Sequence, residues 1–302
     1  MNRPRILRLG LLFLLSWLPS HGQTTPAPLP DIPTLMHQVE AHQREAETVE
    51  KDYIYRESTQ ADELDSHGSV KKTTTREFDV FWTEGVNVHR MVSKDGKELS
   101  PEEQKKLSER IDKDVAKARE RRLKADASGK ETDSQGHEEI TVSRMLELGS
   151  FTNARRETIN GRDTIVVDFT GDPKAKTRNP GEAAIHDMAG TIWIDEADRS
   201  IVRIGGQFIN PFKIGGGLLV SVRKGTSFTF RNRKINDEVW LPESLEAHGQ
   251  ARIMLFLSFD GNVRARYGDY RKFKATSTIL PGINQIEEDK PDSEPKEPQP
   301  KP

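Results

Sequence analysis

The chain has 302 residues, a formal net charge of -2 and no cysteine, with 33% hydrophobic and 31% charged residues. The lack of cysteine excludes disulfides, thiolate metal sites, cysteine nucleophiles and lipid attachment through a cysteine. Mixed charges of both signs give no indication of a nucleic-acid partner. So polar a chain is expected to place part of its length in solvated tails, linkers or charged helices around one core.

Residues 1–22 have the order of a secretory signal peptide. Three arginines precede an apolar core over residues 9–18, and the small residues Ser20 and Gly22 follow. This core is about half as long as the roughly twenty apolar residues of a spanning helix. We therefore predict cleavage after Gly22, which leaves a net charge of -5 and a soluble, periplasmic or secreted protein that does not span the membrane. An uncleaved N-terminal anchor is the alternative.

Both ends of the remaining chain are polar and rich in proline. Residues 24–33 contain four prolines, and residues 287–302 alternate charged residues with five more. Such composition cannot bury enough apolar surface to fold by itself. We predict a linker over 23–33, a single domain over 34–284, and a disordered tail over 285–302.

The domain is expected to begin with an amphipathic helix that starts near Pro33 and Thr34. Its apolar face follows helical spacing through Leu35, Val39, Ala46 and Val49. Period-two alternation then predicts strands over Asp52–Thr59 and Lys71–Val92, joined by a turn at Asp65–Gly68. In the second strand, Phe78, Val80 and Trp82 share one face.

A charged helical insertion is predicted over about 100–136. Ser100, Pro101 and Glu103 have the pattern of a capping box with proline at the first helical position, and helix-forming residues follow to about Asp126. Because its apolar stripe is thin, this helix should cover a sheet edge or project into solvent. Its basic run Arg119–Lys124 either faces anionic lipid headgroups or is a solvated helix face among acidic neighbours.

A short helix is expected around residues 138–148, with Gly149 as a left-handed cap. From Phe151 onward the pattern indicates successive strands, and Arg252–Phe259 has the two-sided apolar pattern of a strand covered on both faces. The predicted turns are Asn160-Gly161, Asp195–Arg199, Asn236-Asp237 and Asp260-Gly261. Hairpins without intervening helices predict a mainly β (α+β) fold, either an incomplete antiparallel β-barrel or a strongly curved meander sheet covered by a few helices.

No catalytic or metal motif stands out. The histidines are scattered without metal-ligand spacing. Ser69-x-x-Lys72 and Ser221-x-x-Lys224 match a serine–lysine motif of penicillin-recognising enzymes, but its companion motifs are missing. We therefore predict a protein that is not an enzyme and uses no metal or cofactor, with an unrecognised hydrolase as a minor alternative.

Three strand segments resemble a known superfamily. Gly190–Asp195, Ile201–Ile204 and Val239–Glu243 look like recurring strands of the lipoprotein-carrier superfamily, which includes the Lol-type proteins that sort outer-membrane lipoproteins. More narrowly, Gly190–Phe273 is similar to uncharacterised secreted proteins of soil bacteria. The resemblance implies an incomplete antiparallel barrel wrapped over helices, with a concave apolar face that holds acyl chains.

The alternating apolar residues are the candidate site. They either fill a core or line an open groove, and sequence alternation does not distinguish these two cases. The groove hypothesis gives a non-enzymatic periplasmic carrier or sensor that binds a lipid acyl chain or a lipoprotein. The filled core gives an envelope protein–protein interaction module with a protein partner. The groove candidates are Phe78, Val80, Trp82, Ile165, Val167, Phe169, Ile192, Ile194, Leu255 and Leu257.

Overall fold

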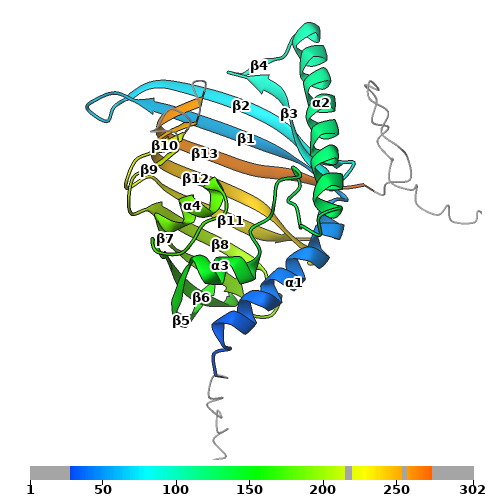
Figure 1. Cartoon of the computed structure of the whole chain (residues 1–302). Coiled ribbons are helices and arrows are strands. Elements are labelled where there is room, and N and C mark those ends of the chain that lie inside the picture. Colours follow the sequence, from blue (N-terminus) through cyan, green and yellow to red (C-terminus); the bar gives the residue numbers. More distant parts are fainter. Residues whose placement is uncertain (1–27, 215–219, 254–256, 274–302) are drawn as a thin grey trace, which may run out of the picture.

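The computed structural model describes residues 28–214, 220–253 and 257–273 (Figure 1). The predicted signal peptide, residues 23–27 of the predicted linker and the predicted tail lie outside the described residues. The helices are α1 (Ile32–Glu50), α2 (Pro101–Asp126), α3 (Val142–Leu148) and α4 (Pro180–His186). The strands are β1 (Tyr53–Leu64), β2 (Val70–Thr83), β3 (Val86–Lys94), β4 (Lys97–Glu98), β5 (Gly149–Ile159), β6 (Arg162–Gly171), β7 (Met188–Asp195), β8 (Ile201–Phe208), β9 (Phe212–Ile214), β10 (Val220–Val222), β11 (Ser227–Ile235), β12 (Val239–Ile253) and β13 (Leu257–Lys272).

These strands form one antiparallel sheet. Its order is β4-β3-β2-β1-β13-β12-β11-β8-β7-β6-β5, and β10 pairs with both β12 and β9. The first strand therefore lies beside the last one, which joins the N-terminal hairpins to the C-terminal meander. The sheet ends at β4 and β5 and does not close into a barrel. This confirms the predicted mainly β class and the open sheet with a few helices.

Local turn chemistry explains several strand boundaries. Asn160 and Gly161 have φ angles of 51° and 78°, the positive values of a tight hairpin turn between β5 and β6. Glu84 and Gly85 also have positive φ, at 48° and 74°, and they divide the predicted strand Lys71–Val92 into β2 and β3. The predicted turn at Asp65–Gly68 joins β1 to β2 and is confirmed.

The predictions for the β12–β13 hairpin were wrong. Ile253 of β12 pairs with Leu257 of β13 in an antiparallel register, so Arg252–Phe259 is not one strand. Gly261 lies within β13, where a Cβ atom would come 1.9 Å from the Asp62 backbone oxygen of β1. Glycine is needed there for close approach of two strands, and not for a turn.

Two helix predictions also needed correction. Gly149 has an extended φ of -172°, so it is no left-handed cap, and a Cβ there would meet the Phe169 ring at 2.5 Å. The region after Phe151 was expected to lack helices, yet it contains α4. The Asn179 side chain caps α4 by accepting from the Glu182 backbone N–H, with Pro180 in the first turn.

The helices pack on different parts of the sheet. In the first core cluster, Leu35, Met36 and Val39 of α1 pack with apolar residues of β6 and β7. In the third, Val115 and Ala118 of α2 pack with residues of β3 and with Phe81 of β2. Phe81 points to the opposite face of β2 from Val80, which belongs to the second cluster. Thus α2 covers the edge region of the sheet, as expected, and carries the predicted capping box.

Candidate ligand-binding face

Strand register defines the face of the sheet that α1 covers. Val167 pairs with Ile192, and Ile192 pairs with Ile204. The same row continues through Phe230 and Leu245 to Ala265 on β13. Directly paired residues of neighbouring strands project to the same side. The face under α1 therefore extends across β8, β11, β12 and β13.

The middle of this face is a strip of half-buried apolar side chains. We name it the central apolar strip, and its members are Phe228, Phe230, Leu245, Ala247 and Val263. They belong to none of the three core clusters formed by described residues. Figure 1 shows these strands in the middle of the sheet, with α3 and α4 toward the β5 end and α2 near the β4 end. The strip is therefore an apolar surface of this face that lies outside the cores.

Gly206 shapes one end of the central apolar strip. It pairs with Phe228, and a Cβ atom at position 206 would come 2.7 Å from the Phe228 ring. Because glycine has no side chain, the Phe228 ring can occupy the space over the backbone of β8 at this position.

Most of the ten predicted groove residues lie beside this strip, within the cores. Ile165, Val167, Ile192 and Ile194 lie in the cluster beneath α1 and are at most 8% exposed. Phe169 is 8% exposed, with its ring centroid 4.9 Å from that of Phe151. Val80 is fully buried in the second cluster, with Phe78 packed against it, and Trp82 is half-buried below the Lys51 ammonium group. Leu255 lies outside the described residues, and of Leu257 only the backbone is described.

α1 has few fully buried residues. Among its 19 residues, Leu35, Met36 and Val39 are buried, all in the N-terminal half. Farther along, Glu40 accepts a hydrogen bond from the Val142 backbone N–H of α3 at 3.1 Å, and Arg44 pairs with Glu131 at 2.7 Å. The helix is therefore held by a buried patch in its N-terminal half, by the polar contacts of Glu40 and Arg44, and by Val49, which packs against the second core cluster.

The C-terminal end of α1 meets a tyrosine cluster. The Tyr55 ring lies 6.0 Å from Tyr267 and 5.6 Å from Tyr270 between ring centroids. Burial raises the pKa of Tyr55, and the nearby Glu50 carboxyl raises it further. Burial also raises the pKa of Glu50 itself to about 7, with a contribution from the Glu47 carboxylate. Glu50 is therefore partly protonated near neutral pH.

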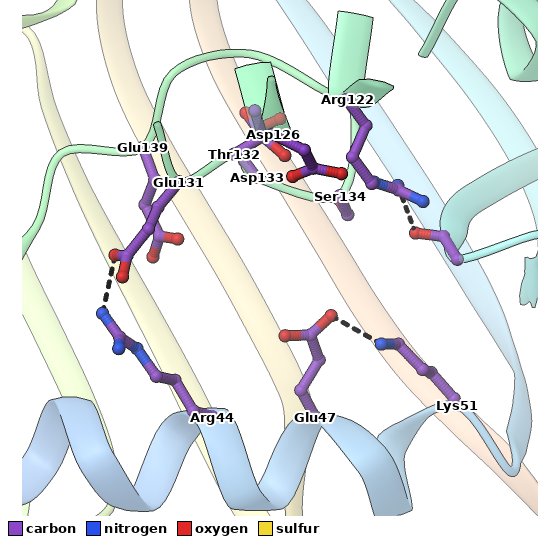
Figure 2. Close-up of a pocket in the computed structure, with 11 residues that line it drawn as sticks. Arg44, Glu47, Lys51, Arg122, Asp126, Glu131, Thr132, Asp133, Ser134 and Glu139 are labelled. Atoms are coloured by element: carbon purple, nitrogen blue, oxygen red, sulfur yellow. Dashed lines mark hydrogen bonds and ion pairs between the residues drawn. The ribbon is translucent and has the colours of Figure 1, made fainter. Parts of the chain in front are cut away.

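A separate cavity of about 380 Å³ is charged and does not suit a hydrocarbon chain. It lies between α1, the end of α2 and the segment 131–139, and Figure 2 shows Arg44, Glu47 and Lys51 directed into it from α1. Lys51 pairs with Glu47 at 2.9 Å. Burial, together with the nearby Glu131 carboxylate, raises the pKa of Glu139 on the opposite wall.

Neither serine–lysine motif has the geometry of a reactive site. The Ser69 backbone N–H donates to Asp65 within a hairpin turn, and Ser221 lies in β10. Within the described residues, no group of three or more His, Asp and Glu could hold a metal ion. In the same part of the chain, no helix is both long and apolar enough to cross a membrane.

No protein-family model and no curated protein matches this chain. Among solved structures it is similar to an outer membrane lipoprotein-sorting protein domain from Vibrio parahaemolyticus, with 10% identity, a TM-score of 0.33, and coverage of 80% of this chain and 95% of that one. A LolA superfamily protein from Nitrosomonas europaea has 7% identity and a TM-score of 0.30, covering 79% and 94%. A DUF1329 family protein from Desulfovibrio piger has 8% identity and a TM-score of 0.33, covering 80% and 95%. At these values the similarities assign neither a family nor an activity, and the similarity to soil-bacterial proteins stays a prediction.

Proposed function

We propose that this chain is a non-enzymatic carrier or sensor of the cell envelope that binds an acyl chain of a lipid or lipoprotein. The observation that carries the proposal is the central apolar strip, which lies on the α1 face of the sheet and outside the three cores. Its five apolar side chains lie in two neighbouring rows across β11, β12 and β13, and each methylene buried against them contributes about 0.8 kcal/mol.

In this proposal α1 is a movable cover at one end of the strip. Three of its residues are buried, so the helix can separate from the sheet once this patch, the packing of Val49 and the polar contacts at Glu40 and Arg44 are broken. The predicted groove residues Ile165, Val167, Ile192 and Ile194 then extend the binding surface once α1 has moved. Phe78, Val80, Trp82 and Phe169 would border it.

The test is binding of a fluorescent fatty acid to the mature protein, combined with native mass spectrometry after purification from a bacterial periplasm. Phe230→Glu places a charge in the central apolar strip and should weaken binding at least tenfold, because a carboxylate is expensive to bury beside a hydrocarbon chain. Thr229→Glu is the matched control, since its side chain lies on the opposite face of the same strand.

Circular dichroism and thermal unfolding should report a folded protein for both variants. Recovery of ligand-free protein with no fatty-acid uptake would reject the proposal. Equal loss of binding in the two variants would show that the strip is not the binding surface.

The alternative is an interaction module with a filled interior. Complete burial of Ile165, Val167 and Ile194 beneath α1 favours it for that end of the sheet. If fatty-acid binding depends on Phe230, an interaction module with a completely filled interior is excluded.

A further inference from the structure

One face of α2 carries a continuous stripe of cationic side chains, which we name the cationic stripe. Its members are Lys106, Arg110, Lys113, Lys117, Arg121 and Lys124. Their spacings of four and three residues average one helical turn, so the six side chains align along one side of the helix. The stripe is about 27 Å long at 1.5 Å per residue.

The cationic stripe faces away from the sheet. The opposite side of α2 packs on β3 through Ile111, Val115 and Ala118. Lys106, Arg110 and Lys124 are 73%, 81% and 74% exposed. The other three members are exposed as well. Figure 1 shows α2 at the periphery of the molecule, so a large flat partner could reach this side of the helix.

Nearby acids neutralise only part of the stripe. Lys106, Arg110 and Lys124 each pair with one acidic residue of α2. Lys113 and Lys117, at its centre, make no ion pair within the described residues. From Lys105 to Lys124 the helix has nine basic and four acidic residues, although the whole chain is net negative. The centre of α2 is therefore a region of positive electrostatic potential.

The residues of the predicted basic run Arg119–Lys124 divide between two positions on α2. Arg119 pairs with Glu84 at 3.4 Å, and Arg122 donates to the Gly85 carbonyl at 2.9 Å. These two arginines hold the β2–β3 turn. Arg121 and Lys124 belong to the stripe, which continues back along the helix to Lys106.

We propose that the cationic stripe docks the protein on a membrane surface of anionic lipid headgroups. Charge complementarity supports this partner. Each Lys or Arg near an anionic bilayer raises the affinity of a protein for that bilayer about fivefold. A straight row of flexible, exposed side chains suits headgroups that can rearrange around it. The exposed Leu123, at 62%, lies near one end of the row and can enter the headgroup layer.

The experiment is co-sedimentation of the full mature protein with phosphatidylcholine vesicles, with and without phosphatidylglycerol. We expect binding that requires phosphatidylglycerol and weakens as salt rises. Lys113→Glu combined with Lys117→Glu should lower the binding constant at least 25-fold, because each change removes an attraction worth about fivefold. The matched control is Lys174→Glu with Lys224→Glu, two exposed lysines outside α2, which should bind like the wild-type protein.

Equal vesicle binding by the stripe variant and the wild-type protein would overturn the proposal, as would equal binding without phosphatidylglycerol. Binding to polyglutamate without binding to vesicles would replace the membrane with an acidic protein partner. Fatty-acid uptake should be unchanged in the stripe variant. Failure of docking is thereby distinguished from failure of the proposed carrier function.

Discussion

Glu50, at the end of α1, should make stability depend on pH near neutrality. Its pKa is about 7 in the folded protein, against an ordinary value of 4.5. The Glu50 carboxyl binds its proton more tightly in the folded protein than in the unfolded chain. The stability that this protonation contributes is therefore fully present below pH 4.5 and is lost as pH rises through 7. Glu50→Gln should therefore be more stable than the wild-type protein at pH 8, by about 1 to 3 kcal/mol, and similar to it at pH 4.

Urea denaturation at both pH values measures this difference. The control is Glu45→Gln, an exposed position on the same helix. If the free energy of unfolding of Glu50→Gln differed from that of the wild-type protein by the same amount at both pH values, the raised pKa of Glu50 would not be the cause.

Glu182 should have the opposite pH dependence. Its side chain is 3% exposed, and the Arg144 guanidinium donates to both of its oxygens at 2.9 Å, which lowers its pKa to about 2. The Glu182 carboxyl binds its proton less tightly in the folded protein than in the unfolded chain. The stability that the Arg144–Glu182 ion pair contributes is therefore present above pH 4.5 and is lost as pH falls toward 2.

At pH 7, Glu182→Gln should destabilise the protein by about 2 to 3 kcal/mol, because the half-buried guanidinium of Arg144 loses the buried one of its two carboxylate partners and keeps only the exposed Glu147. Urea denaturation at pH 7, 5 and 3 should show the variant and the wild-type protein converging as the pH falls. If the free energies of unfolding of the two proteins instead differed by the same amount at all three pH values, the destabilisation would not come from the ion pair between Arg144 and Glu182.

At the scale of the element, α1 should open more easily than the sheet. Leu35 is fully buried against β6 and β7, and Leu35→Ala should cost about 2 to 4 kcal/mol through lost burial and a residual cavity. Gln38→Ala, on the exposed side of the helix, should stay within about 0.5 kcal/mol.

Hydrogen exchange measures where the change acts. The Leu35→Ala variant should exchange faster in α1 while β12 and β13 remain protected, because α1 is joined to the sheet by few contacts. Equal acceleration in the central strands would mean that α1 and the sheet unfold together, and the helix would then be no movable cover.

Elements with local signals were the ones that sequence could predict. The capping box of α2 lies within four residues, and the turn at Asn160-Gly161 needs two residues that tolerate positive φ. The sequence from Arg252 to Phe259 contains no Gly, Asn, Asp or Pro, so its apolar run has the pattern of one continuous strand. α4 was missed although Asn179 and Pro180 are local helix-start signals, because the surrounding strand pattern dominated the interpretation.

At the scale of the whole molecule, the candidate site depends on contacts that sequence does not encode locally. The alternation of Phe228 and Phe230 is visible in the sequence, but their place on the α1 face follows from pairing with β8 and β12. Val263 reaches the same face only because β13 returns beside β12. The predicted residues of β6 and β7 were correctly identified as one apolar face, and their cover by α1 was not predictable from alternation.

The extent of the central apolar strip leads to a prediction about ligand length. If an acyl chain lies along the strip, each added methylene should contribute about 0.8 kcal/mol, or about fourfold in affinity, until the chain exceeds the apolar surface. Titration with a series of saturated fatty acids should thus give a steep rise and then a plateau. Phe230→Glu should reduce the slope, because the charge interrupts the strip, whereas Thr229→Glu should preserve it. A flat dependence on chain length in the wild-type protein would mean that the headgroup determines binding, and the strip would lose its assigned role.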